Sequence, residues 1–153
     1  MKKLNNNFII IFFTAFIIFG ISLIKDFGVS FDEGSNRLYG LVNGNYILKT
    51  FLPKNRYENI FKNITSEKFS EKIQQKKPTD LHEFPDRAYG VIFELPVTAI
   101  EMILNFNSNN EVYLYRHLMT FLLYSISLIF FYLLLKKIFK NKLLSFLGVL
   151  FLI

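Results

Sequence analysis

Two charge-free apolar runs constrain this chain more than any other feature of its sequence. They cover Phe8–Ile24 and Leu118–Leu135, and neither contains Asp, Glu, Lys or Arg. Each is close to the roughly 20 residues that an α-helix needs to cross a bilayer core about 30 Å thick. Because we find no reliable strand alternation in the sequence, and lipid forces a spanning segment to satisfy its own backbone hydrogen bonds, we expect an all-α membrane protein.

A third apolar run, Leu143–Ile153, reaches the last residue of the sequence. Its composition is that of the opening of another span, so we expect residues 143–153 to start a third transmembrane helix that is truncated here. The chain is then the N-terminal part of a longer membrane protein. The alternative is a complete small protein with a short re-entrant tail.

The first run also has to be compared with a cleaved signal peptide, since Lys2 and Lys3 precede it. The apolar region of such a peptide is usually about 7–15 residues long and is followed by a small-x-small cleavage site. Phe8–Ile24 is longer, and no such site occurs before Lys25. An uncleaved anchor is the better interpretation.

The distribution of charge predicts the orientation of the spans. The net charge is +6, yet all 12 acidic residues lie between Asp26 and Glu111, while the link KKIFKNK has four Lys and no acid. Short basic flanks stay in the cytoplasm, whereas long loops cross regardless of charge. A nucleic-acid partner is therefore disfavoured, and the lipid bilayer is the expected surrounding. We predict a cytoplasmic N-terminus (1–7), a first span (8–24), an extracytoplasmic loop (25–112), a second span (113–135) and a cytoplasmic link (136–142).

Two parts of the outer loop have helical patterns. In Asp32–Leu52 apolar residues recur at helical spacing, and Gly40 and Gly44 interrupt it, which indicates a kink or close packing. Near the end of the loop Pro96 suits the first turn of a helix. The residues after it are predicted to form an apolar stripe on a short helix that lies in the membrane interface, with Glu101 off the stripe; the stripe consists of Val97, Ile100, Ile103 and Leu104.

The stretch GVSFDEGSNRLYG places two acids soon after the first span. Ser30 to Glu33 reads S-x-x-E, a capping box in which Ser30 caps a helix and Glu33 reaches back to its amide. Asp32 would then lie in the first turn, where the helix dipole favours a carboxylate. The functional alternative is that one carboxylate acts as a general base or holds a metal just outside the bilayer.

Other polar residues of the loop and of the second span offer weaker candidates. His82, Glu83 and Asp86 could act as ligands or acid–base groups, but Pro85 separates them and their spacing matches no specific metal signature, so a polar loop is the competing interpretation. Arg116, beside His117, is either an interfacial anchor or a contact for a lipid phosphate.

Taken in order, three segments resemble the N-terminus of GT-C fold membrane glycosyltransferases, in particular the superfamily of protein O-mannosyltransferases and lipid A aminoarabinose transferases. FDEGSNRLYG is similar to the acidic motif of their first outer loop, and DRAYGVIFELPVTAIE resembles a YG-x-x-FE stretch later in that loop. The segment from RHLMTF to LLSFLG is similar to their Arg-led second span with its basic cytoplasmic end.

The resemblance implies an enzyme, a hexosyl or pentosyl transferase, which moves a sugar from a polyprenyl-phosphate carrier to an acceptor on the outer side, in a bacterial inner membrane. It implies Asp32 as the catalytic acid of the motif and Glu33 as its second residue, and in some members this acid binds a divalent metal. Arg37 and Arg116 become candidates for binding the carrier phosphate. The implied lining of the site consists of His82, Asp86, Tyr89 and Glu94.

Two other classes of protein remain open at this point. One is a non-enzymatic polytopic membrane protein, such as a transporter subunit or a sensor whose outer loop binds a partner. The other is a different enzyme of lipid-linked sugars, such as a polymerase or a ligase. As a fragment of a longer enzyme, the chain is expected to be inactive alone.

Overall fold

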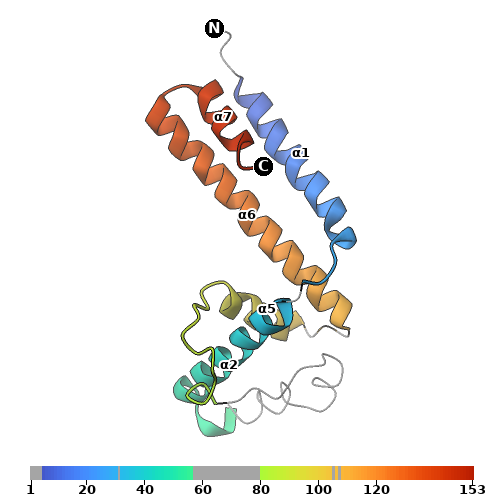
Figure 1. Cartoon of the computed structure of the whole chain (residues 1–153), viewed down its shortest axis with the longest axis vertical. Coiled ribbons are helices and arrows are strands. Elements are labelled where there is room, and N and C mark those ends of the chain that lie inside the picture. The colour runs from blue at the N-terminus through green and yellow to red at the C-terminus, as the bar shows by residue number, and fades with distance from the viewer. Residues whose placement is uncertain (1–4, 31, 57–79, 105, 107) are drawn as a thin grey trace. The chain divides into compact units, whose positions relative to one another are not determined.

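A computed structural model describes residues 5–30, 32–56, 80–104, 106 and 108–153. The elements in this part are all helical and contain no strand, which confirms the all-α class for the described residues (Figure 1). A GT-C arrangement is a finer prediction that these helices alone do not test. The elements are α1 (Asn6–Leu23), the 3-10 turn η1 (Ile24–Asp26), α2 (Glu33–Phe51), α5 (Glu94–Leu104), α6 (Asn109–Phe139) and α7 (Lys142–Leu150).

The chain divides into two compact units. The first, called the helical hairpin unit below, combines Met1–Phe27 with Arg116–Ile153, and the second, the loop unit, is Gly28–Tyr115. The boundary after Phe27 follows the first apolar helix, and the boundary at Arg116 falls inside α6.

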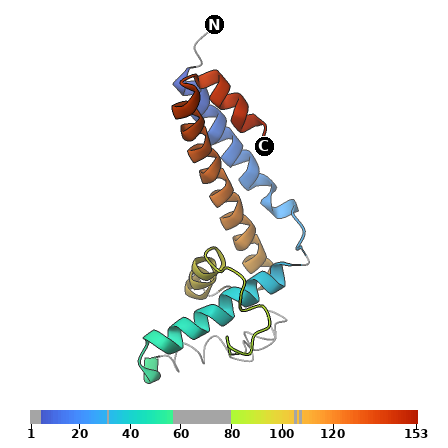
Figure 2. The same ribbon diagram turned by 60° about the vertical axis from the view of Figure 1, so that its left-hand side comes forward.

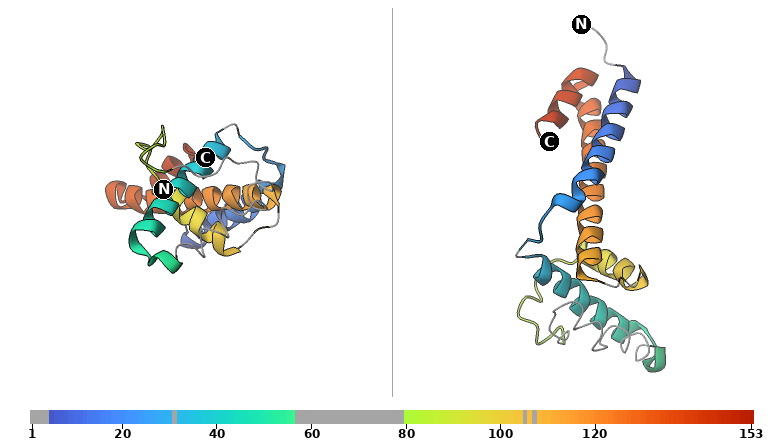
Figure 3. Two further views of the ribbon diagram at one scale, coloured as in Figure 1. Left: turned by 90° about the horizontal axis from the view of Figure 1, so that it is seen from below. Right: turned by 90° about the vertical axis from the view of Figure 1, so that its right-hand side faces the viewer.

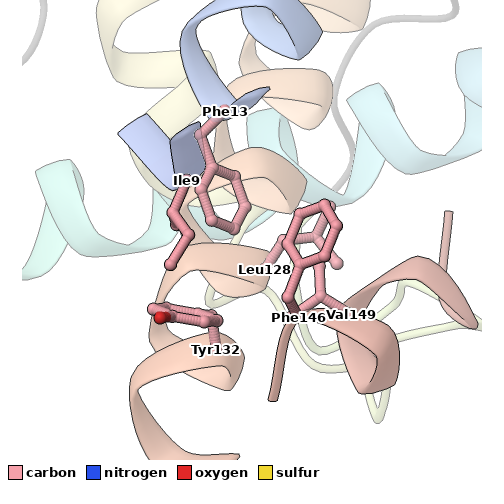
Figure 4. Close-up of a cluster of buried hydrophobic side chains, with 6 residues drawn as sticks. All are labelled: Ile9, Phe13, Leu128, Tyr132, Phe146 and Val149. Carbon is pink, nitrogen blue, oxygen red and sulfur yellow. The ribbon is translucent and has the colours of Figure 1, made fainter. Parts of the chain in front are cut away.

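The helical hairpin unit packs α1, α6 and α7 together, and Figures 1 and 2 show α1 beside α6. Its core takes two side chains from each helix (Figure 4): Ile9, Phe13, Leu128, Tyr132, Phe146 and Val149. Aromatic rings fix part of this contact, since Phe12 meets Phe146 edge to face at 4.8 Å between ring centroids. Such pairs add to the burial of apolar surface.

A tight connection joins α6 to α7. Lys140 has a positive φ of 51°, which reverses the chain directly after α6. The side chain of Asn141 then caps α7 by accepting from the amides of Leu143 and Leu144 at 3.0 and 3.4 Å. At 1.5 Å per residue the nine residues of α7 extend about 14 Å, which is less than a bilayer core. The predicted third span stays a prediction.

Within the part of the chain that the structure describes, two helical segments are long and apolar enough to cross a membrane: Asn6–Asp26 and Asn109–Phe139. Only 17% of the most apolar window of each is buried. The core helix of a soluble protein would be mostly covered, whereas here large side chains such as Ile11, Phe19 and Phe130 are about two-thirds exposed. This exposed apolar surface favours association with lipid.

The loop unit is built on the contact between α2 and α5, which Figures 2 and 3 show in teal and yellow. Gly40 allows the close approach, because a β-carbon there would lie 2.9 Å from the carbonyl oxygen of Glu94 and would meet the hydroxyl of Thr98. Val42 and Val97 are almost completely buried at this contact. Close packing, one of the two interpretations of the glycines, therefore applies to Gly40, while Gly44 has open space around its Cα.

The four residues of the predicted α5 stripe do not share one environment. Pro96 lies in the first turn, as expected, but of the four stripe residues only Val97 is buried, together with Thr98 and Glu101. The other three, at positions 100, 103 and 104, are exposed by 37%, 80% and 52%. The buried face follows the 97, 98, 101 spacing because Glu101 has a charged partner on α2, a contact that a hydrophobicity pattern does not reveal.

Candidate functional site

The centre of the loop unit is a buried ion pair between α2 and α5. Arg37 is fully buried and Glu101 is 2% exposed. The Nε and one terminal nitrogen of the guanidinium donate to Oε1 of Glu101, the Nε bond measuring 2.8 Å. A buried charge is tolerated only when it is paired and hydrogen-bonded, so this contact specifies how the two helices face each other.

This pair bears on the proposed role of Arg37. Its guanidinium lies inside the loop unit, directed at Glu101, and its side chain has no exposed surface. A phosphate ligand would have to displace the carboxylate or approach an atom that is covered here. Arg37 therefore has a structural function in this arrangement, and binding of the carrier phosphate by Arg37 stays a prediction.

Asp32 lies at the start of α2, but the capping box is wrong. The helix begins at Glu33, and Asp32 itself is the N-cap, with φ −86° and ψ −12° and no side-chain capping bond. The amide of Glu33 donates to the carbonyl oxygen of Ser30 at 3.3 Å. In the predicted capping box, the hydroxyl of Ser30 would accept from this same amide of Glu33. Because the carbonyl of Ser30 accepts from it instead, α2 begins later than predicted.

Asp32 is exposed, and its backbone carbonyl accepts from the amide of Asn36 at 2.9 Å, which fixes the first turn. The N-terminal end of the helix dipole favours a carboxylate at this position. Glu33 is half-buried with its Oε2 covered. The two motif acids therefore differ, because only Asp32 presents an exposed side chain.

A group of aromatic and acidic residues lies near this helix start, and we call it the tyrosine–carboxylate cluster: Asp32, Tyr39, Phe84, Asp86 and Tyr89. Phe84 is buried and Tyr39 half-buried, whereas the other three residues are exposed. Tyr39 stacks on Tyr89 with ring centroids 5.4 Å apart and planes 6° from parallel. Phe84 meets Tyr39 edge to face at 5.7 Å. The hydroxyl of Tyr39 donates to Oδ2 of Asp86 at 3.3 Å. These contacts bring the 84–89 stretch onto α2.

The electrostatics of Tyr39 connect Asp32 to the same cluster. Partial desolvation raises the pKa of the Tyr39 phenol, and the carboxylates of Asp86 and Asp32, together with Tyr89, raise it further. Asp32 and Tyr39 are seven residues apart, which is two helical turns, so they lie on one side of α2. The phenol therefore stays neutral and keeps its proton for hydrogen bonding.

His82 lies at the edge of this group, near the end of α2. Its ring meets Tyr46 edge to face at 5.6 Å, and its amide donates to Oδ1 of Asp80 at 3.0 Å. That hydrogen bond lowers the pKa of Asp80, and Lys49, whose Nζ is 3.6 Å from Oδ2, lowers it as well. His82 is exposed and anchors the loop to α2 through these local contacts.

The remaining predicted site residues lie elsewhere. Glu94 is the first residue of α5 and is half-buried. Arg116 belongs to the helical hairpin unit, where it is 4% exposed and its carbonyl accepts from the hydroxyl of Thr120 at 3.0 Å. Its neighbour His117 meets Phe27 edge to face at 6.4 Å. The buried side chain of Arg116 differs from the headgroup-level anchor that was one of its two interpretations.

A metal site was left open by the resemblance. Across the described ranges, no group of three or more His, Cys, Asp or Glu side chains is positioned to hold a metal ion. A divalent metal at this site stays a prediction.

The cluster combines a stacked aromatic pair with two carboxylates at the surface. Tyr89 is 63% exposed, so part of its ring is open to a ligand, and stacking against Tyr39 holds the ring in place. Aromatic faces bind apolar ligand faces, and ionised carboxylates accept strong hydrogen bonds from hydroxyl groups. A ligand with both features, such as a sugar ring, fits this chemistry.

Sequence reasoning missed two residues of this region. Tyr39 stands in the quoted motif and shares its helix face with Asp32, a spacing of seven that could have singled it out. Glu101 is an acid among apolar residues in α5, and a lone charge in such a setting suggests a buried partner.

Comparisons with known proteins do not assign the chain to a family. No family model matches the chain, and neither curated proteins nor solved structures include a significant match.

Proposed function

We propose that this chain is the N-terminal part of an integral membrane glycosyltransferase that moves a sugar from a polyprenyl-phosphate carrier to an acceptor on the extracytoplasmic side. The observation that carries the proposal is the tyrosine–carboxylate cluster. It joins the DE motif with the AYG segment that follows some fifty residues later, and these are two of the segments on which the resemblance rests.

In this proposal Asp32 is the general base. Its carboxylate takes the proton from the acceptor hydroxyl, and the acceptor oxygen forms a bond to the anomeric carbon of the donor sugar. The bond between that carbon and the phosphate oxygen breaks, and its electron pair leaves with the polyprenyl phosphate. A base must reach the proton that it removes, and the exposed position of Asp32 at the helix start supports this assignment.

The other members of the cluster then have binding functions. The open face of Tyr89 receives a sugar ring, and Asp86 accepts hydrogen bonds from sugar hydroxyls while it holds the phenol of Tyr39. We assign recognition of the departing phosphate to cations, since preorganised positive charge stabilises a developing anion. Arg116 stays a candidate for this function from the sequence alone, since its side chain is buried in the structure, as that of Arg37 is.

The proposed topology places residues 1–7 and 136–142 in the cytoplasm and residues 25–112 outside, in a bacterial inner membrane. Two candidate spans on either side of the loop unit support it, as does the lysine-rich link after the second. The carrier headgroup lies at the membrane surface, which is where a loop bounded by two spans would meet it.

The test uses the full-length protein and its transfer activity. Asp32→Asn removes the base while it preserves size, and transfer should be abolished with unchanged expression. Asp26→Asn is the matched control, because Asp26 is also an exposed acid, at the end of the first candidate span, and is not a member of the cluster. Retention of activity in Asp32→Asn would refute the assignment, as would an equal loss in both variants.

A further inference from the structure

The outer side of α5 is an apolar face that the described residues of the loop unit leave exposed. Ile92, in the turn before the helix, is 93% exposed, Ile103 is 80% exposed and Leu104 is 52% exposed. Positions 92, 96, 100 and 103 follow one another at helical spacing, and Pro96 and Ile100 are also exposed. No charged residue interrupts these positions.

The inner side of the same helix holds its polar residues. Thr98 and Glu101 are buried against α2, Glu101 by its bonds to Arg37 and Thr98 by its close approach to Gly40. Rotating α5 to hide the apolar face would expose or break the buried ion pair, which is strongly unfavourable. The helix is therefore held with its apolar side outward, the reverse of a helix in a water-soluble unit.

We propose that this outer face of α5 lies in the lipid interface, with Ile92, Ile100, Ile103 and Leu104 in the boundary between headgroups and acyl chains. Short apolar faces bind there by burying their surface about 5–10 Å deep. The chain itself supports lipid as the occupant. Only four residues separate Leu104 from Asn109, the start of a candidate span, so a fully extended link of five peptide steps reaches at most about 18 Å.

This inference does not depend on sugar transfer, because it follows from exposure, the buried pair and the neighbouring span alone. It gives the Arg37–Glu101 pair a further consequence, since the pair determines which face of α5 meets the membrane. It also gives a function to Ile92, whose side chain is 93% exposed.

The composition of the chain allows a background-free test, because it contains no Trp. The full chain carrying Ile103→Trp is reconstituted in phosphatidylcholine vesicles whose acyl chains are brominated, and bromine quenches nearby tryptophan emission. Phe130→Trp, at an exposed position within the charge-free apolar part of α6, is the deep reference. Glu83→Trp, at an exposed polar loop position, is the aqueous reference.

We expect Ile103→Trp to lose clearly more emission than Glu83→Trp, and to lose more when the bromines are near the headgroup than when they are near the chain ends. Phe130→Trp should show the opposite depth preference. Quenching no greater than that of Glu83→Trp would overturn the proposal. In that case red-shifted emission would place the face in water, and blue-shifted emission would show that protein covers it.

A second measurement uses the absence of Cys and keeps the proposal testable if the bulky tryptophan disturbs α5. Ile103→Cys and Glu83→Cys are labelled in unbrominated vesicles with a charged, membrane-impermeant maleimide. Although position 103 is 80% exposed within the protein, its labelling should be much slower than that of position 83. Equal rates would contradict insertion.

Discussion

The buried pair of Arg37 and Glu101 makes the sharpest prediction about the loop unit. The two side chains are 0% and 2% exposed and are joined by two hydrogen bonds. We consider Glu101→Leu, Arg37→Met and the double variant. Each single change leaves one buried polar group without its main partner, whereas the double change replaces both by apolar groups of similar length.

The magnitudes follow from the cost of an uncompensated buried charge. Removing one partner of a buried pair typically costs about 3–5 kcal/mol, whereas replacing the whole pair by apolar residues is often neutral or stabilising. Glu101→Leu should be the more damaging single change, because it leaves a buried guanidinium, which always carries its charge, without the carboxylate that accepts from it. The double variant should therefore recover most of the stability lost in either single variant.

The assay takes advantage of the cysteine-free sequence. Val42 is fully buried on α2, so Val42→Cys provides a thiol that reacts only when the loop unit opens. In this background, measured on the full chain in lipid nanodiscs, a loss of about 3–5 kcal/mol corresponds to labelling roughly 150- to 5,000-fold faster, since about 1.4 kcal/mol is a factor of ten.

Two results would refute this reasoning. Single variants that accelerate labelling less than about fivefold, or about 1 kcal/mol, would mean that the pair is not buried as the structure has it. A double variant as unstable as the sum of the singles would mean that the two residues act independently, since coupled neighbours deviate from additivity.

Three further predictions concern the packing and the electrostatics of the two units. Gly40→Ala should destabilise the loop unit by about 1–3 kcal/mol in the same labelling assay, because its β-carbon meets α5. Gly44→Ala should be neutral or should stabilise the unit by up to about 1 kcal/mol. Equal effects of the two variants would contradict the close approach of α2 and α5 at Gly40. Desolvation and Asp86 raise the pKa of Tyr39 above its ordinary value of 10.0. The phenolate absorbance of Tyr39, isolated by comparison with Tyr39→Phe, should therefore titrate with a midpoint above pH 10. In Asp86→Asn this midpoint should move to lower pH. The stabilisation tied to this raised pKa is complete below pH 10 and is lost as the pH rises through the folded value, and an unchanged titration in Asp86→Asn would exclude the carboxylate as a cause. Asn141→Ala should destabilise α7 by about 1 kcal/mol through loss of its cap, measured as faster hydrogen exchange in that helix, and unchanged exchange would contradict the capping bonds.

The sequence predicted the helices better than it predicted their faces. The apolar runs led to the two candidate spans because hydrophobicity and length alone define such a helix. Pro96 likewise marked the first turn of α5. These features are local, so no knowledge of the partner helix was needed.

The buried and exposed faces of the helices were harder to predict, because they depend on contacts between residues that are distant in the sequence. Glu101 was predicted to lie off the apolar stripe, yet it is buried because Arg37 approaches from 64 positions earlier in the sequence. The capping box failed for a local reason, since a turn closed by the carbonyl of Ser30 served the amide of Glu33. Hydrophobic periodicity cannot encode either contact.

The same distinction applies to the candidate site. Asp32, Asp86 and Tyr89 were named from motifs, and the residue that connects them, Tyr39, emerged only from the ring stacking and the hydrogen bond that α2 makes possible. Arg37 was chosen for its charge near the motif, but its charge is used inside the unit. The types of the residues identified the candidates for the site. Their burial in the structure then distinguished residues with a structural function from residues that are exposed to a ligand.

The central claim is transfer of a sugar from a polyprenyl-phosphate carrier, and turnover of the donor tests it most directly. The purified full-length protein in proteoliposomes is supplied with a panel of polyprenyl-phosphate sugars, together with a membrane extract that supplies acceptors, and release of free polyprenyl phosphate is measured. We predict release from at least one donor by the wild-type protein and by Asp26→Asn, and none by Asp32→Asn. Release that is the same in Asp32→Asn, or no release from any donor by the wild-type protein, would contradict the proposed function.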